Sequence, residues 1–245
     1  MKNEPRAAVY SGTRNVYSTM ETAAKSLIAH DGADEVYFLI EDEKFPRELP
    51  EFVHTIDVSK QTYIQEGSAN WRSPFTYMAS IRLAYPDIFK EYDRILSLDI
   101  DTMVTGSLDG LWKTYLDEVY FAACAEYHTL IGAKVEPYYN IGVTLMNLKK
   151  MREGDFWKRA VEMVNTERRT YLDQDILTEM CNGYTITLPI KYNYNPPILK
   201  TRELPKEEIA IRHYAGESFF SYREKALYIQ YEEMPWSEAI KRSMT

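Results

Sequence analysis

The sequence predicts an α/β fold in which helices flank a mixed, mostly parallel central sheet. Short apolar segments alternate with segments of helical period through the first half of the chain, and this order is typical of a parallel sheet covered by helices. The apolar segments of the second half follow one another less regularly, so we expect them to extend the sheet in mixed directions. With 245 residues, of which 45% are hydrophobic, the chain is long enough for one domain with a substantial core.

The first half supplies most of the parallel sheet. Its apolar segments predict strands at 7–11, 36–40, 52–58 and 94–98. Between the first two strands a helix is expected, because one face of it collects Tyr17, Met20, Ala24, Leu27 and Ile28. A second main helix is expected at 76–85. The second half contains apolar runs at 120–125 and 141–148. It also predicts helices at 151–164 and 173–180, and two short strands at 184–188 and 209–213.

No repeat, low-complexity stretch or Gly/Ser linker divides the chain. We therefore assign one domain to residues 1–217 and a separate aromatic segment to residues 218–245. That segment would leave a costly apolar patch in water, since it contains Phe219, Phe220, Tyr222, Leu227, Tyr228, Ile229, Tyr231 and Trp236. We expect it to pack back on the domain, with a homodimer interface or a membrane contact as the alternative.

Charge and cysteine content narrow the function classes. A formal net charge of −8 argues against nonspecific nucleic-acid binding, which needs a basic surface. An anionic ligand would need local compensation, and a divalent cation is the simplest source. No apolar run approaches a transmembrane length, and no signal sequence precedes the first strand. The two cysteines do not suggest a disulfide, so the sequence predicts a cytoplasmic location.

Residues 94–112 form the most informative segment, RILSLDIDTMVTGSLDGLW. An apolar strand leads directly into Asp99 and Asp101, and alternate residues of an extended chain point to the same side. In parallel sheets, ligands bind beyond the carboxyl ends of the strands, where this pair would lie. Two carboxylates there would repel each other without a counterion. The pair therefore predicts a site for a hard divalent cation such as Mn²⁺ or Mg²⁺.

The aspartate pair has two other interpretations. In an acidic chain a D-x-D triplet arises by chance, and most carboxylates are solvated. Phosphatases of the haloacid dehalogenase type carry a similar D-x-D-x-T motif, but here Thr102 comes one place early and Met103 holds the expected position. That motif also lies near the first strand, whereas Asp99 follows several units. The position directly after an apolar strand favours the cation site.

Further motifs accompany this segment, and in order they are VYSGTRNVY, FTYMASIRLAY, LSLDIDTMVTG, YYNIGVTLMNLKKMRE, YLDQDILTEM and IRHYAGE. With them the chain, over about residues 7–216, resembles the family 8 glycosyltransferases, a retaining group that includes glycogenin and bacterial lipooligosaccharide galactosyltransferases. The resemblance implies a GT-A fold with a Rossmann-like mixed central sheet. It also implies an Mn²⁺-dependent (or Mg²⁺-dependent) enzyme that moves a hexose, glucose or galactose, from a UDP-sugar donor. The acceptor would be a hydroxyl of a glycan, a lipid-linked molecule or a protein.

By this resemblance, the first motif receives the nucleotide base. Tyr17 would stack on uracil, with Asn15 and either Gly12 or Thr13 near the base and ribose. The local pattern also fits a helix start at which Asn15 caps and Tyr17 packs, and the two interpretations are compatible.

The resemblance places the metal and the diphosphate between three motifs. Asp99 and Asp101 would hold Mn²⁺ together with His213, and Asp99 would also contact the donor. Arg82 would bind the donor through its guanidinium, although a surface arginine of a helix has the same pattern. Gly216, three residues after His213, is assigned to the donor as well. A structural role for the histidine is the alternative.

The donor sugar is assigned to the two remaining motifs. Asn140 would hydrogen-bond the sugar, and Gly142 would let the backbone approach closely. Asp173 and Gln174 are assigned as the catalytic residues, Asp173 on the sugar hydroxyls and Gln174 on the sugar's β face. Acidic capping of a helix start is the alternative for that motif. Glu126 is placed loosely where relatives carry an aspartate.

The last motif departs from the family pattern. Relatives continue it as H-x-x-G-x-x-K-P-W, with the lysine on the diphosphate, whereas Phe219 occupies the lysine position here. The missing contact would have to come from Arg223 or Lys225. A noncatalytic nucleotide-sugar binder with a degenerate site is therefore the alternative function.

Overall fold

The structure, a computed structural model, describes residues 4–71, 76–126, 136–195 and 203–244. Seven strands form the central sheet in the order β3-β2-β1-β4-β7-β6-β8. Their bounds are β1 Ala7–Ser11, β2 Glu35–Ile40, β3 Val53–Asp57, β4 Arg94–Leu98, β6 Phe121–Ala125, β7 Tyr139–Asn147 and β8 Thr185–Thr187. The first four in sequence pair in parallel, whereas β7 runs antiparallel to both β4 and β6. The predicted mixed sheet is confirmed.

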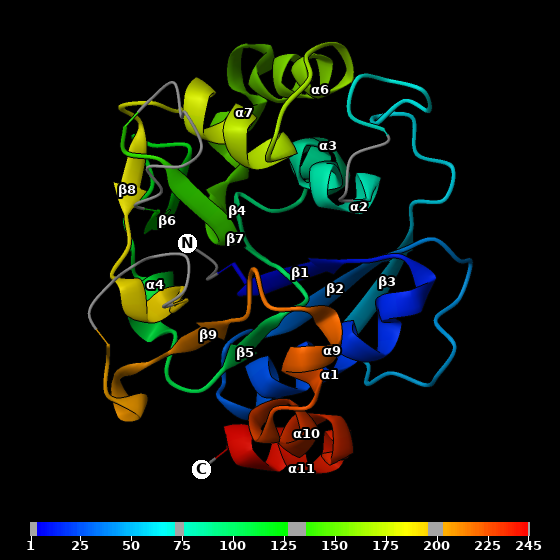
Figure 1. The fold of residues 1–245 in the computed structure, drawn as a ribbon, viewed down its shortest axis with the longest axis vertical. Helices are drawn as coiled ribbons and strands as arrows, with labels where there is room; N and C mark the ends of the chain where they lie inside the picture. The colour runs from blue at the N-terminus through cyan, green and yellow to red at the C-terminus, as the bar shows by residue number, and fades with distance from the viewer. Residues whose placement is uncertain (1–3, 72–75, 127–135, 196–202, 245) are drawn as a thin grey trace.

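Helices cover both faces of this sheet (Figure 1). By the core clusters that their side chains join, α1 Tyr17–Ala29, α10 Ala226–Glu233 and α11 Trp236–Ser243 lie on one face, and α2 Tyr77–Ser80, α3 Tyr85–Ile88, α5 Leu148–Arg152, α6 Phe156–Thr166 and α7 Leu172–Met180 lie on the other. Alternate residues of β1 serve the two layers, since Ala8 and Tyr10 join one core cluster and Ala7 and Val9 the other. A strand buried on both faces has to be apolar throughout, which is why its sequence shows a continuous apolar run.

A second, two-stranded sheet lies at the carboxyl end of β4. It pairs β5 Thr102–Val104 antiparallel with β9 Ile211–His213, with Thr102 opposite His213. The sequence predicted β9 but not β5. Short helix α4 Asp109–Trp112 follows β5.

Two predicted helices are interrupted. The segment expected as one helix over 76–85 consists of α2, a 3₁₀ turn at Ile81–Ala84 and α3, which has Pro86 in its first turn. The segment expected at 151–164 breaks between α5 and α6, where Gly154 and Asp155 both have a φ of 57°. Left-handed backbone cannot continue a right-handed helix, so α6 starts afresh.

The aromatic C-terminal segment forms α9 Phe219–Arg223, α10 and α11, of which α10 and α11 pack against α1 and α9 contacts α10. Tyr222, Tyr228 and Tyr231 are buried there, and Trp236 meets Phe52 edge to face at a centroid distance of 6.1 Å. Among the described residues, no helix combines the length and the apolar character that crossing a membrane requires.

Candidate active site

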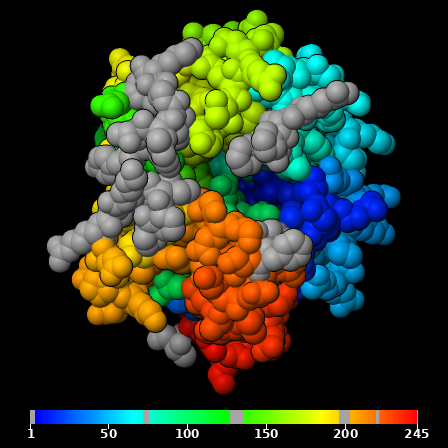
Figure 2. Space-filling view, viewed as in Figure 1, coloured from blue at the N-terminus to red at the C-terminus, as the bar shows by residue number. Residues whose placement is uncertain are grey.

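A cavity of about 650 Å³ opens at the carboxyl ends of β1 and β4. Its wall combines segments far apart in the sequence, including Gly12, Arg82, Asp101, Gln174 and Glu217. Figure 2 shows the blue N-terminal segment and the orange C-terminal segment on the same face of the molecule. The cavity therefore occupies the place at which open α/β sheets bind their ligands.

Asp99, Asp101 and His213 converge beside this cavity, and their ligand atoms all lie within 4.8 Å of one another. His213 Nε2 is 3.2 Å from Asp101 Oδ1 and 3.8 Å from Asp99 Oδ2. A backbone hydrogen bond holds the two segments together, because Tyr214 N–H donates to the Asp101 carbonyl at 3.0 Å. The predicted cluster is thus brought together by the pairing of β5 with β9.

The aspartates converge for a different reason from the one that the sequence suggested. The chain is not extended between them but turns, and Thr102 donates to the Asp99 carbonyl through its N–H at 3.2 Å and its hydroxyl at 2.7 Å. This turn, rather than strand alternation, directs both carboxylates to one side.

The three residues fit a divalent cation. His213 is 2% exposed, and its Nε2 makes no well-aligned hydrogen bond within the described residues. Burial alone would lower the pKa of His213, but the charges of Asp101 and Asp99 outweigh it and raise that pKa. Two carboxylates and an imidazole thus enclose a point that favours positive charge, and their donor set suits Mn²⁺.

Gly142 of β7 makes room for this cluster. A Cβ at that position would lie 2.2 Å from His213 Cε1 and 2.9 Å from Asp99 Oδ2. The group of this chain that approaches Gly142 closely is the His213 ring.

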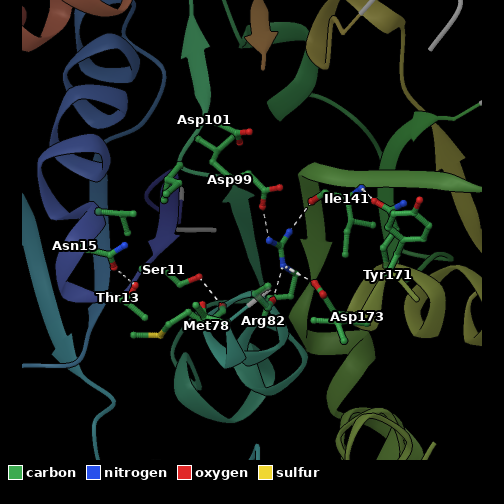
Figure 3. A pocket seen from close by; sticks show the side chains of 18 of the residues that line it. Ser11, Thr13, Asn15, Met78, Arg82, Asp99, Asp101, Ile141, Tyr171 and Asp173 are labelled. Carbon is green, nitrogen blue, oxygen red and sulfur yellow. Dashed lines mark hydrogen bonds and ion pairs between the residues drawn. The ribbon is translucent and has the colours of Figure 1, made fainter. Parts of the chain in front are cut away.

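Arg82 is a buried bridge between two carboxylates (Figure 3). Its guanidinium donates to Asp99 Oδ1, lies 2.8 Å from Asp173 Oδ2 and donates to the Ile141 carbonyl at 2.6 Å. Burial would lower the pKa of Arg82, but Asp99 and Asp173 more than compensate and raise it. At 5% exposure it is not a surface arginine. Arg82 therefore links the predicted cation site to the predicted sugar site.

The two carboxylates respond to Arg82 in opposite ways. Burial opposes ionisation of Asp99, but Arg82 and His213 hold the pKa of Asp99 below its usual value. Asp173 has a side chain only 7% exposed, against 34% for Asp99, and burial raises the pKa of Asp173 to about 7 despite Arg82. Their charged partners explain the opposite signs, because Asp99 has both Arg82 and His213 beside it, whereas Asp173 has Arg82 but also the negative charge of Asp99.

The predicted sugar-binding residues lie together on the other side of Arg82. Glu126 Oε2 accepts from Asn140 Nδ2 and from Gln174 Nε2, both at 3.1 Å. Asp173 and Gln174 occupy the first turn of α7 and line the cavity. Leu172 just before them has a φ of 43°, a strained conformation of the kind found at functional sites.

The residues assigned to the base divide into two groups. Gly12, Thr13 and Asn15 line the cavity, whereas Tyr17 lines a separate cavity nearby. The Tyr17 ring is 2% exposed, packs against Phe45, and donates from its hydroxyl to Asp42. The predicted stacking of Tyr17 on a base does not fit this geometry, because the ring faces the core from the start of α1.

The end of the last motif is only partly as expected. Gly216 has a φ of 80° and is exposed, and Glu217 rather than Gly216 lines the cavity. The Phe219 side chain lies outside the described residues. Arg223 pairs with Glu232 at 3.2 Å, whereas Lys225 Nζ lies 3.5 Å from Glu217 Oε2. Of the two candidates for the missing lysine, Lys225 is thus beside the cavity.

Sequence reasoning missed Asn193. Its side-chain oxygen lies 2.7 Å from His213 Nδ1, and the residue is fully buried. Nothing in the stretch YNYN marks one asparagine as special. Its role becomes visible only once β9 places the histidine.

The chain matches Glycosyl transferase family 8 over residues 16–218. Glycosyltransferase GlyE of Streptococcus pneumoniae serotype 4 is 28% identical over an alignment of 271 positions, which covers 97% of this chain and 63% of GlyE. A Haemophilus influenzae relative is 28% identical over an alignment of 158 positions, which covers 58% of this chain and 48% of that relative. This chain thus spans roughly half to two thirds of these relatives.

Solved structures show the same fold. The crystal structure of GlyE superposes with a TM-score of 0.71 at 24% identity, covering 98% of this chain and 63% of that one. Galactosyltransferase LgtC, solved in complex with donor and acceptor sugar analogues, superposes with a TM-score of 0.71 at 21% identity, covering 95% and 99%. These superpositions identify the sheet and its helices as a GT-A fold. The sequence match over residues 16–218 shows that this chain belongs to glycosyltransferase family 8.

Proposed function

We propose that this chain is a retaining glycosyltransferase that uses Mn²⁺ (or Mg²⁺) and a UDP-sugar, with glucose or galactose as the sugar. The acceptor is a hydroxyl of a glycan, a lipid-linked molecule or a protein. One observation carries the proposal: Asp99, Asp101 and His213 converge at a cavity whose wall also holds Arg82 and Asp173. Membership of family 8 and the histidine beside the carboxylates favour this function over a phosphatase.

Asp99, Asp101 and His213 would hold the cation. When bound, it supplies positive charge that offsets the charge developing on the diphosphate as the anomeric bond breaks. The cavity wall needs that charge, since it contains Asp99, Asp101, Asp173 and Glu217. Arg82 is already shared between two of these carboxylates. A diphosphate would otherwise meet net negative charge.

The side chains of α7 and β7 position the sugar. Asp173, held by Arg82, accepts hydrogen bonds from sugar hydroxyls, and Gln174 lies against the β face. The Gln174 amide is a poor nucleophile, and its NH₂ group is engaged with Glu126, so we do not assign it a covalent intermediate. The bond from the anomeric carbon to the phosphate oxygen breaks, and UDP leaves with the electron pair. The acceptor hydroxyl attacks the short-lived oxocarbenium ion from the same face, and its proton goes to the departing phosphate.

The test is release of UDP from a panel of UDP-sugars in the presence of Mn²⁺. We expect turnover with one donor and none after Asp101→Ala, which removes a cation ligand. A thermal-shift assay supplies an independent readout, because a ligand at 100 times its Kd stabilises the native state by about 2.7 kcal/mol. Metal-dependent UDP binding without turnover of any donor would favour a noncatalytic nucleotide-sugar binder, the alternative function.

The cysteines bear on the location. Cys124 and Cys181 are buried and unpaired, and such thiols suit a reducing compartment. We therefore propose a cytoplasmic location, which fractionation of the producing cells would test.

A further inference from the structure

His213 can offer a lone pair to a cation through only one of its two ring nitrogens. A neutral imidazole carries a proton on the other nitrogen, and the partner of that nitrogen decides which tautomer forms. Nε2 is the atom that faces Asp99 and Asp101. A cation site here therefore requires the proton to reside on Nδ1.

A backbone group fixes the direction of the hydrogen bonds that reach Nδ1. Gly142 N–H can only donate, and it donates to Asn140 Oδ1 at 3.1 Å. The Asn140 amide is oriented from its other end too, since its Nδ2 donates to the Glu126 carboxylate at 3.1 Å. The oxygen and nitrogen of Asn140 are thus assigned by groups whose roles are known.

The orientation of the Asn140 amide in turn determines the orientation of the Asn193 amide. Asn193 lies 2.8 Å from Asn140 Oδ1, an acceptor, and must present its NH₂ group there. Its oxygen then faces His213 Nδ1 at 2.7 Å, and an amide oxygen can only accept. The Nδ1 atom must therefore carry the proton. Asn193, Asn140 and His213 are 0%, 7% and 2% exposed, so solvent does not compete for these bonds.

From this we infer that Asn193 is a positioning residue, which holds His213 as the Nδ1–H tautomer and turns the Nε2 lone pair toward the cation. The inference rests on the cation site of the proposed function. Metal-bound histidines commonly donate their second ring N–H to such a partner, and loss of the partner costs about 10–100-fold in metal affinity. Without Asn193, the proton could move to Nε2, where Asp101 would accept it and close the site.

The chain offers variants that separate this role from simple packing. Asn193→Ala removes the acceptor for Nδ1–H. Asn193→Asp keeps an acceptor but opposes Asn140 Oδ1, so it should cost stability while preserving the tautomer. Asn195→Ala is the matched control, because Asn195 is a buried asparagine two residues away whose Nδ2 donates to the Ala215 carbonyl at 2.8 Å.

Two measurements test the inference. Titration with Mn²⁺ alone should show about 10–100-fold weaker binding for Asn193→Ala, a smaller loss for Asn193→Asp, and wild-type binding for Asn195→Ala. In the Mg²⁺-bound wild-type protein, ¹⁵N NMR of the His213 ring should show the proton on Nδ1, and Asn193→Ala should lose that ordered proton. Only four histidines need to be assigned.

The outcomes distinguish this inference from the proposed function. Wild-type Mn²⁺ affinity in Asn193→Ala, equal losses in the Asn193 variants, or a wild-type ring without a proton on Nδ1 would overturn it. If the wild-type protein binds Mn²⁺ with the expected tautomer but releases no UDP from any donor, the inference stands and the catalytic proposal fails. Wild-type protein that binds no divalent cation would remove both.

Discussion

Replacing Gly142 with alanine tests the cation site through its geometry. The added methyl group would lie 2.2 Å from His213 Cε1, whereas ordinary contact begins at 3.4 Å, so the ring has to retreat by about 1.2 Å. Metal–ligand distances tolerate about 0.2 Å, so His213 would be lost as a ligand. We expect the Mn²⁺ affinity to fall by about 10–100-fold or more, and a fall of that range corresponds to a loss of about 1.4–2.7 kcal/mol in binding free energy.

Titration of the metal-free protein with Mn²⁺, followed by the signal of the free ion, measures this loss. Gly32→Ala is the control, because its methyl group would meet Leu27 Cδ1 at 2.4 Å, a comparable clash within the core. It should lower stability but leave the affinity unchanged. A Gly142→Ala protein that binds Mn²⁺ as tightly as the wild type would refute the geometry of the site.

Three further substitutions probe the surroundings of the site. Arg82→Ala leaves Asp99 and Asp173 facing each other, and we expect a loss of about 3–5 kcal/mol in the unfolding free energy of the metal-free protein, measured with urea; a loss near zero would contradict the bridge. Burial raises the pKa of Asp173 to about 7, against about 3.9 in the unfolded chain, so the native state binds this proton more tightly. Its stabilising effect is fully present below pH about 4 and is lost as the pH rises through about 7; Asp173→Asn should remove that component from urea titrations across this range, and an unchanged pH dependence would argue against it. Tyr17→Leu should lower Tm, by about 2–4 °C for each kcal/mol lost, without changing the affinity for UDP, and weaker UDP binding would restore the stacking role.

The elements of the sheet were predictable because their burial leaves a local pattern. Strands such as β1 and β4 are apolar on both faces, and their lengths follow directly from the sequence. The short strand β5 was missed, because three residues make too short a pattern and its partner β9 comes more than one hundred residues later. Pairing across such a distance depends on the whole fold rather than on local sequence.

The site shows a similar division. Asp99 and Asp101 could be paired because they follow a strand whose end lies at the ligand-binding edge of the sheet, whereas His213 was joined to them only by the resemblance to family 8 glycosyltransferases. Tyr17 was assigned to the base by resemblance, although its helical period places it with Met20 and Leu27 on the buried face of α1. Here the periodicity was the better guide. Asn193 was beyond prediction, because its importance depends on a side-chain contact with a distant residue.

The pairing of β5 with β9 has a consequence for how this protein responds to chelators. A backbone hydrogen bond joins Tyr214 N–H to the Asp101 carbonyl, and Thr102 lies opposite His213 in the pair of β5 with β9, so the ion would fasten a late portion of the chain to an early one. Removing it should loosen that fastening first, and amide hydrogen exchange at Ile211–His213 should accelerate before the rest of the sheet changes. The C-terminal helices, which follow this strand, would then share in the loosening, so that a single ion governs how firmly the end of the polypeptide is anchored.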